Sequence, residues 1–326
     1  CGEDSTECCL DTTSHNFVWE IDTLGDYGSY LNDVAIIDEN NIWVVGYIKD
    51  GDSTYNAAHW EGNEWEFILI SPAGLTNPIS CIFAFNENNI WFGKVGLPVH
   101  WDGQNYYKYT PANSSHPGQP SINSIWGSNS NDLYFVGDNG SIVHYDGSGF
   151  TKMESLPGQG GTDVDLIDIY GTDEEHIWIV GDDDQIGKSI VLEYSSGEWH
   201  TKFAYTYNEP TDGVPEGRYR SVCTIGDTLY IFCGTVLWKE SITGGEGYGA
   251  PHTLFPAGGT NRLRGIDYND IFDVGYCQKV MHYNGKNWTR IFPHDCDQLV
   301  NYNSVDYIEG MVVIVGLKGQ VLMGKR

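Results

Sequence analysis

Hydrophobic and polar positions alternate along this chain in short segments, and the pattern recurs seven times. Each copy has an apolar run, an acidic or Asn-rich turn, a second apolar run that closes on Gly, then an aromatic segment and another turn. The clearest copies begin with LNDVAIIDENNIWVVG (31–46), INSIWGSNSNDLYFVG (122–137) and LIDIYGTDEEHIWIVG (166–181). A repeat of roughly 40–50 residues with several strand-sized pieces per copy predicts a β-propeller.

The copies can be aligned at one apolar position in the first strand, which we expect to be buried between blades. Its occupants are Val34, Ile82, Ile125, Ile169, Val222, Ile266 and Val305. All are β-branched, which suits a pleated and buried strand. The second strand then ends on Gly46, Gly137, Gly181, Gly275 and Gly316, with Cys233 in the fifth copy. The second copy departs at Trp91-Phe92-Gly93, which predicts a bulged or shortened strand there.

The last copy ends at QVLMGKR and lacks a fourth strand, whereas NFVWEID (16–22) forms an isolated strand near the N-terminus. We predict that this strand completes blade seven, because closing the ring removes an exposed sheet edge. The fold class is therefore all-β, a seven-bladed propeller of four-stranded antiparallel blades. Residues 16–326 form one domain after a tether at 1–15. The expected blades span 31–70, 79–110, 122–156, 166–207, 219–255, 263–293 and 302–326.

Charge and hydropathy narrow the function classes. The net charge is −28, from 45 acidic and 17 basic residues. This argues against nucleic-acid binding, which needs a cationic surface. There is no apolar stretch long enough to span a bilayer. The chain starts with CGEDSTE (1–7), which resembles a processed bacterial lipoprotein. That resemblance implies lipid modification of Cys1, an N-terminal membrane anchor and a site on the bacterial outer membrane and cell surface.

Cysteine usage is consistent with an oxidising, extracellular compartment. Cys277 and Cys296 flank strands of blade six and are candidates for a disulfide. Cys8 and Cys9 lie in the tether and either secure the closing strand or bond a neighbouring subunit. The spacing does not determine the connectivity.

Polar residues near the start of each first strand are candidates for a binding site at the channel mouth. We assign this role to Asn32, Asn123, Asn303, Arg220 and Arg264. The two arginines either form a fork for a carboxylate or sulfate, or pair with acidic neighbours.

Two aspartates one residue further along, Asp33 and Asp168, offer a carboxylate pair for acid–base chemistry such as glycoside hydrolysis. The alternative is that both carboxylates accept hydrogen bonds from backbone amides.

Two other groups resemble metal ligands. The third strands carry His59, His100, His144 and His282 in equivalent places. Because these places are far apart around a ring, we predict a structural hydrogen bond in each blade and no shared metal. Asp182, Asp183 and Asp184 form either a solvated loop or a Ca²⁺ site. No other cofactor is expected.

Two Gly/Pro-rich interruptions, 209–218 and 241–262, exceed the tight turns elsewhere. Loops on a rigid scaffold commonly carry recognition. Tyr248, His252 and Phe255 are the aromatic candidates for contacting a partner or a sugar.

The core N-D/N-x-[IL]-[WY]-x-V-G followed by H-[WY]-[DEN]-G resembles the repeats of secreted bacterial β-propeller proteins of unassigned activity. This resemblance covers residues 16–326 and implies no catalytic residue. Our leading hypothesis is a non-enzymatic, lipid-anchored extracellular module for binding or assembly. Its partner is a surface protein, a glycan, or another copy of the chain in a homo-oligomer or filament. The alternative is a glycoside hydrolase or lyase acting at the channel mouth.

Overall fold

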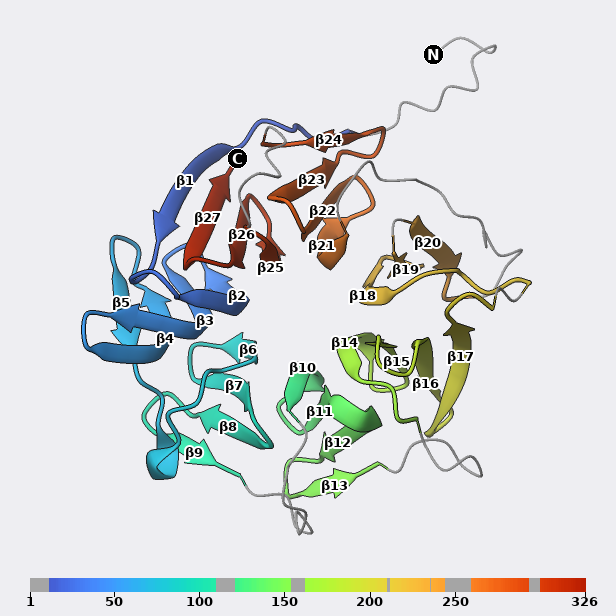
Figure 1. Cartoon of the computed structure of the whole chain (residues 1–326), viewed down its shortest axis with the longest axis horizontal. Helices are drawn as coiled ribbons and strands as arrows, with labels where there is room; N and C mark the ends of the chain where they lie inside the picture. The colour runs from blue at the N-terminus through green and yellow to red at the C-terminus, as the bar shows by residue number, and fades with distance from the viewer. Residues whose placement is uncertain are drawn as a thin grey trace.

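The computed structural model describes residues 12–109, 121–153, 162–209, 212–234, 236–243, 259–292 and 300–326. These residues form seven antiparallel sheets arranged around a central axis (Figure 1), so the predicted seven-bladed propeller is confirmed. Six sheets have four strands, and the fifth blade has three within the described residues. No described helix is long and apolar enough to cross a membrane.

Each blade contributes its first strand to the centre of the ring. The innermost strands are β2 (Tyr30–Asp38), β6 (Cys81–Asn86), β10 (Ile122–Asn129), β14 (Leu166–Asp173), β18 (Tyr219–Ile225), β21 (Thr260–Asp267) and β25 (Tyr302–Ile308). The second strands are β3 (Asn41–Asp50), β7 (Asn89–Lys94), β11 (Asp132–Gly137), β15 (His176–Asp183), β19 (Thr228–Cys233), β22 (Asp270–Gly275) and β26 (Met311–Gly316).

The third and fourth strands form the outer half of each blade. The third strands are β4 (Ser53–Trp60), β8 (Leu97–Trp101), β12 (Ser141–Tyr145), β16 (Lys188–Ser195), β20 (Val236–Ser241), β23 (Lys279–Tyr283) and β27 (Gln320–Lys325). The fourth strands are β5 (Trp65–Ile68), β9 (Tyr106–Lys108), β13 (Phe150–Lys152), β17 (Glu198–Thr206), β24 (Trp288–Arg290) and β1 (Val18–Thr23). Two 3-10 turns, η1 (Pro72–Gly74) and η2 (Asp138–Gly140), lie in connections.

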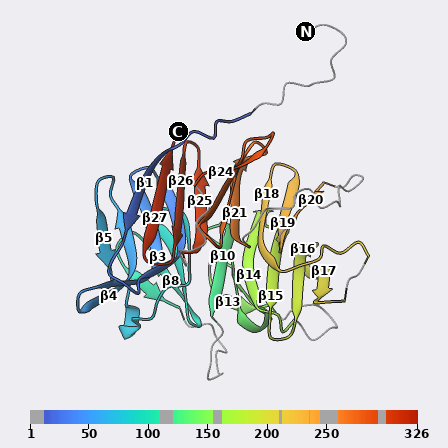
Figure 2. The ribbon, with the colours of Figure 1, turned by 45° about the horizontal axis from the view of Figure 1, so that its top comes forward.

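The N-terminal strand closes the ring as predicted. β1 pairs antiparallel with β27, so that Val18 faces Lys325 and Thr23 faces Gln320. β1 is thus the outermost strand of blade seven, next to the C-terminal strand (Figures 1 and 2). Trp19 packs against Phe292 of the neighbouring blade, with ring centroids 5.1 Å apart. The segment before β1 also contacts blade six, because Thr13 donates a backbone hydrogen bond to the carbonyl of Asn284.

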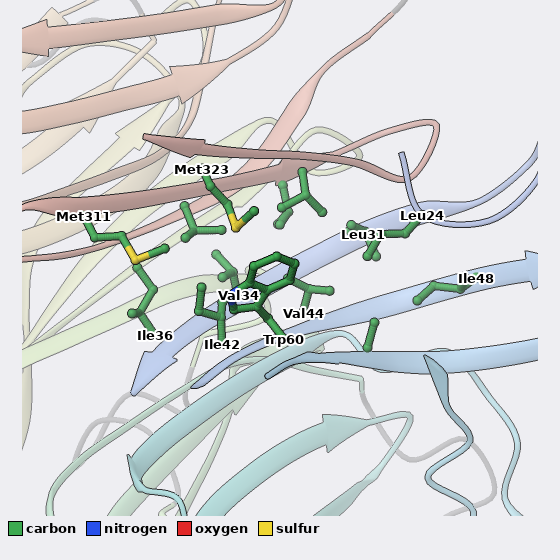
Figure 3. Close-up of a cluster of buried hydrophobic side chains, with 14 residues drawn as sticks. Leu24, Leu31, Val34, Ile36, Ile42, Val44, Ile48, Trp60, Met311 and Met323 are labelled. Carbon is green, nitrogen blue, oxygen red and sulfur yellow. The ribbon is translucent and has the colours of Figure 1, made fainter. Parts of the chain in front are cut away.

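The apolar core lies between adjacent blades. At the junction of blades seven and one, Val34, Val44 and Trp60 meet Met311 and Met323 (Figure 3). The second strand ends on Gly in most blades because the backbone at the start of the first strand lies close to it. A Cβ added at Gly46 would lie 2.2 Å from the carbonyl oxygen of Tyr30, and one at Gly137 would lie 1.8 Å from that of Ser121. A side chain there would separate the first two strands.

Blade six corrects one part of the predicted alignment. Its first strand begins at Thr260, not at 263, and Thr260 pairs with Gly275 as Leu31 pairs with Gly46. The buried core position is Leu263, at 1% exposure, and Ile266 is 42% exposed next to the turn. The prediction favoured Ile266 because it is β-branched, but burial between blades selects an apolar side chain of any shape.

Blade two departs from the pattern, but the prediction of a bulged or shortened second strand is wrong: β7 has six residues, like β11, and pairs with β8 without a register shift. Cys81 pairs with Gly93, so Lys94 occupies the place that Gly46 has in blade one. Its buried ammonium donates hydrogen bonds to the carbonyls of Ile70 (2.6 Å) and Leu75 (2.9 Å). Burial lowers the pKa of Lys94 to about 8.

Candidate functional site: the channel and the rim of blades four and five

We call the face at which the innermost strands begin the start face. Since neighbouring strands are antiparallel, the turns between second and third strands also lie on this face. The turns between first and second strands lie on the opposite face. The start face therefore carries the loop at 24–29, the turn at 183–188 and the segment 212–218.

Asparagines at the start of the innermost strands join neighbouring blades. Each donates its side-chain amide to a backbone carbonyl of the next blade: Asn32 to Ile79 (2.8 Å), Asn123 to Leu166 (3.0 Å), Asn261 to Tyr302 (2.8 Å) and Asn303 to Leu31 (2.7 Å). The three asparagines predicted as ligand-binding are thus engaged within the ring, and a role in ligand binding remains a prediction. Sequence reasoning missed Asn261 because Arg264 had been aligned there.

The next position along each innermost strand forms a buried polar ring. Its members are Asp33, Cys81, Ser124, Asp168, Ser221, Arg262 and Ser304. Most have short side chains that form hydrogen bonds to the adjacent blade. Asp33, for example, accepts from the backbone N–H of Ile82 (3.0 Å) and from the Oγ–H of Ser304 (2.6 Å).

Asp168 is the centre of a buried ion cluster across blades four to six. Arg262 and Arg264 of blade six both donate to its carboxylate, the Nη2 of Arg264 at 2.9 Å. From blade five, the hydroxyl of Ser221 (2.9 Å) and the backbone N–H of Val222 (3.1 Å) donate as well. Burial alone would raise the pKa of Asp168, but the two guanidinium groups outweigh it and hold the pKa below its usual range. We name Asp168, Arg262 and Arg264 the channel cluster.

The two candidate carboxylates have separate partners in the structure. Asp33 and Asp168 each bind a neighbouring strand through backbone amides and hydroxyls, which was the alternative interpretation. The channel cluster balances one carboxylate with two guanidinium groups. This leaves Arg264 bound to protein atoms, including the carbonyls of Val222 (3.1 Å) and Leu263 (2.8 Å).

Arg220 lies in a second cluster, on the start-face rim between blades four and five. Its Nη2 is 2.9 Å from the buried carboxylate of Asp182, which also accepts from the Nε of Arg218 at 2.9 Å. Ser189 donates to Asp182 at 2.7 Å, and Tyr207 donates its hydroxyl to the same carboxylate. Burial, together with this hydrogen bond to Asp182, raises the pKa of Tyr207 to about 12. Arg220 and Arg264 thus occupy different clusters and form no common fork.

The rim arginines remain partly open to solvent. The side chain of Arg218 is 40% exposed and that of Arg220 is 25% exposed. Arg218 also pairs with Asp184 in the turn at 183–188, where Ile186 is exposed. The buried hydroxyl of Tyr219 donates to the carbonyl of Pro215, which anchors segment 212–218. We call Ile186, Arg218 and Arg220 the arginine patch. Ca²⁺ binding at Asp182–Asp184 remains a prediction, and a cation there would compete with two guanidinium groups.

The four repeated histidines have the structural role that was predicted. In each, Nε2 bonds to the first residue of the second strand: His59 to Asn41, His100 to Asn89, His144 to Asp132 and His282 to Asp270, at 2.7–2.9 Å. Each ring also stacks on an aromatic residue of that strand, with centroids 4.3–4.6 Å apart.

We expect His100→Ala to lower the free energy of unfolding by about 2 kcal/mol, because it removes both the hydrogen bond to Asn89 and the stacking on Trp91. Burial lowers the pKa of His100. His100 is therefore protonated at a higher pH in the unfolded chain than in the folded protein. Its contribution to stability decreases as the pH falls below about 6.5. Urea titrations at two pH values measure both effects. The exposed His176→Ala is the control, and an equal loss in that variant would contradict the assignment.

Several predicted residues lie outside the described residues: Cys1, Cys8, Cys9, Tyr248, His252, Phe255 and Cys296. The described cysteines, Cys81, Cys223, Cys233 and Cys277, form no disulfide with one another. The pairing of Cys277 with Cys296 remains a prediction.

Comparison with known proteins supports the fold. No protein-family description and no curated protein sequence matches the chain. Among solved structures, YCF48 bound to D1 peptide is 17% identical with a TM-score of 0.68, covering 97% of this chain and 99% of that one. Virginiamycin B lyase from Staphylococcus aureus is 12% identical, with a TM-score of 0.68 and coverage of 95% and 100%. The WD40 propeller domain of Doa1 is 9% identical, with a TM-score of 0.65 and coverage of 95% and 98%. At these identities the likeness establishes the fold alone.

Proposed function

We propose that this chain is a non-enzymatic protein-binding module and that its partner docks on the start face at the arginine patch. One observation carries the proposal: Arg218 and Arg220 both pair with the buried carboxylate of Asp182, yet both remain partly exposed to solvent. Both guanidinium groups are held in position before a partner arrives, so little side-chain entropy remains to be lost on binding. Arginine is enriched in protein–protein interfaces, where its planar group both stacks and donates hydrogen bonds.

The arginine patch also departs from the repeat. In the inter-blade position occupied by Asn32 in blade one, blade four has Ile167 and blade five has Arg220. Ile186, which is exposed, lies two residues after Asp184 in the turn that pairs with Arg218. In a chain of net charge −28, such a patch favours a partner that presents carboxylates around an apolar group.

The channel supports the non-enzymatic part of the proposal. In the channel cluster, Asp168, Arg262 and Arg264 bind one another and neighbouring strands, and the nearby carboxylate of Asp306 accepts a hydrogen bond from the backbone N–H of Ile36. A general acid or base needs a carboxylate that can exchange a proton with substrate, whereas the carboxylate of Asp168 is held ionised by two arginines. One propeller of similar fold supports binding by analogy, since the YCF48 structure is a complex with a peptide.

The setting we propose is the bacterial cell surface, with the chain held by a lipid on Cys1. The acidic composition, with a net charge of −28, supports this setting. Fractionation of cells that express the wild type or Cys1→Ser tests it. Membrane association that persists in Cys1→Ser would contradict the anchor.

The binding proposal is tested with Ile186→Asp and Arg218→Gln. We expect each to weaken capture of the partner from intact cells, and binding of the purified partner, by about tenfold, as for a central interface residue. Lys318→Gln is the matched control, because it removes one positive charge from an exposed turn on the same face in blade seven. Equal binding by all variants would contradict the proposal. A signal on a glycan array would indicate that the partner is a glycan. A concentration-dependent dimer in sedimentation would indicate that it is a second copy of the chain.

A further inference from the structure

Three metal-ligating side chains meet on the outer hairpin of blade one, away from the channel and the arginine patch. His59 lies in β4, Glu61 directly follows that strand, and Glu66 lies in β5. Each offers one ligand atom, and the three atoms lie within 4.8 Å of one another. His59 and Glu66 face each other across the two antiparallel strands, so their side chains project to the same side of the hairpin. Nδ1 of His59 is 3.6 Å from a carboxylate oxygen of Glu61.

The surrounding hydrogen bonds fix which nitrogen of His59 is free to act as a ligand. Nε2 is 2.8 Å from the side-chain oxygen of Asn41, so it carries the proton and donates it. In blades three and six the same position is a carboxylate, Asp132 or Asp270, which also accepts from Nε2. The lone pair of His59 is therefore on Nδ1, the nitrogen that faces Glu61. A metal-binding imidazole commonly has its second nitrogen held by such an acceptor.

The other histidine blades show that this arrangement is specific to blade one. Opposite the histidine, blades two, three and six have Tyr107, Thr151 and Thr289 in place of Glu66. Since the four histidines share a structural role in their blades, Glu66 is not needed for that role. Its presence adds a second carboxylate beside His59, with one ligand atom of each residue within 4.8 Å of the others.

We propose that His59, Glu61 and Glu66 bind a divalent transition-metal ion such as Zn²⁺. One imidazole nitrogen and two carboxylate oxygens form a three-ligand set that leaves a fourth position open for water or for a group from another molecule. Imidazole favours Zn²⁺ and similar ions over Ca²⁺ and Mg²⁺, which prefer oxygen ligands.

The geometry requires only a small contraction. Tetrahedral Zn²⁺ with bonds of about 2.0–2.2 Å separates its ligands by about 3.3–3.6 Å. Nδ1 and Glu61 already lie 3.6 Å apart, and both glutamates are exposed, so their side chains are free to move inwards. His59 is stacked on Trp43, with ring centroids 4.4 Å apart, and needs no rearrangement.

Calorimetric titration of the full chain with Zn²⁺ tests the site, with Co²⁺ absorption in the visible range as a second readout of coordination. We expect Glu66→Gln to weaken binding of one Zn²⁺ equivalent by at least about tenfold, because it replaces an anionic carboxylate ligand by a neutral amide of the same shape. Glu64→Gln is the matched control, since it removes the same charge from the same exposed turn. A tenfold excess of Ca²⁺ should not displace the Zn²⁺.

Three results would overturn the proposal. These are an absence of Zn²⁺ binding to the wild type, equal affinities in the wild type and Glu66→Gln, or displacement of Zn²⁺ by Ca²⁺ at comparable concentration. Equal losses in Glu64→Gln and Glu66→Gln would show a diffuse attraction to an acidic surface. Thermal unfolding of each variant without metal checks that the hairpin is intact, which both exposed substitutions should preserve.

Discussion

Replacing Asp168 by Asn should lower the free energy of unfolding by about 3–5 kcal/mol, the range observed when one partner of a buried ion pair is removed. The substitution keeps the shape of the side chain but removes the carboxylate that Arg262 and Arg264 both contact in a largely buried setting, and leaves only the more distant charge of Asp306 beside Arg264. It also weakens the hydrogen bonds that the hydroxyl of Ser221 and the backbone N–H of Val222 donate to residue 168, which join blade five to blade four. Urea unfolding followed by tryptophan fluorescence measures the loss.

The control is Glu175→Gln, an exposed acidic residue in a turn of the same blade. It should change the free energy of unfolding by less than about 0.5 kcal/mol. A similarly small effect of Asp168→Asn would show that the channel cluster does not hold the blades together. It would also remove the argument that the carboxylate of Asp168 is committed to the fold.

The same cluster makes stability depend on pH. The arginines hold the pKa of Asp168 below its usual value despite burial. As the pH falls, Asp168 is therefore protonated in the unfolded chain before it is protonated in the folded protein. The contribution is therefore complete above the usual carboxyl pKa of about 3.8, and it is lost as the pH decreases below that value. The difference in stability between wild type and Asp168→Asn should shrink over this acidic range.

Deleting residues 1–23 should abolish cooperative folding of the isolated ring. The deletion removes β1, exposes the edge of β27 and uncovers Phe272 and Phe292, on which Trp19 packs. An unpaired edge beside an apolar face favours aggregation. Size-exclusion chromatography and thermal unfolding should show aggregates and a broad transition.

Two further variants separate ring closure from other effects of truncation. Deletion of residues 1–11 leaves β1 intact and should keep the wild-type transition. A circular permutant that joins Arg326 to Asn16 through a short Gly linker, with new termini opened within 24–29, should fold, because β1 and β27 are already antiparallel neighbours. A truncated chain without β1 that unfolds like the wild type would contradict the role of this strand.

The sequence predicted the fold well because blade packing imposes a regular pattern. Gly46 and Gly137 mark places where backbones approach closely, and the stacked histidines recur with their aromatic partners. The alignment of blade six could not be predicted from β-branching, since Leu263 and Ile266 are both apolar and only burial distinguishes them.

The candidate site was harder to predict, because its residues come from different blades. The pairing of Asp168 with Arg262 and Arg264 joins residues more than ninety positions apart. Asp182 and Arg218 meet because a turn of blade four lies against the segment that leads into blade five. Sequence reasoning singled out Arg220 as a departure from the repeat, but its carboxylate partner follows only from the three-dimensional arrangement.

Hydrogen–deuterium exchange of the full chain, free and saturated with its captured and purified partner, tests the central claim of a start-face binding module most directly. The account predicts slower exchange on binding at 183–188 and 212–220, around the arginine patch, with the opposite-face turns 38–41 and 267–270 unchanged. Protection confined to the opposite face, or none at 183–188 and 212–220, would contradict it.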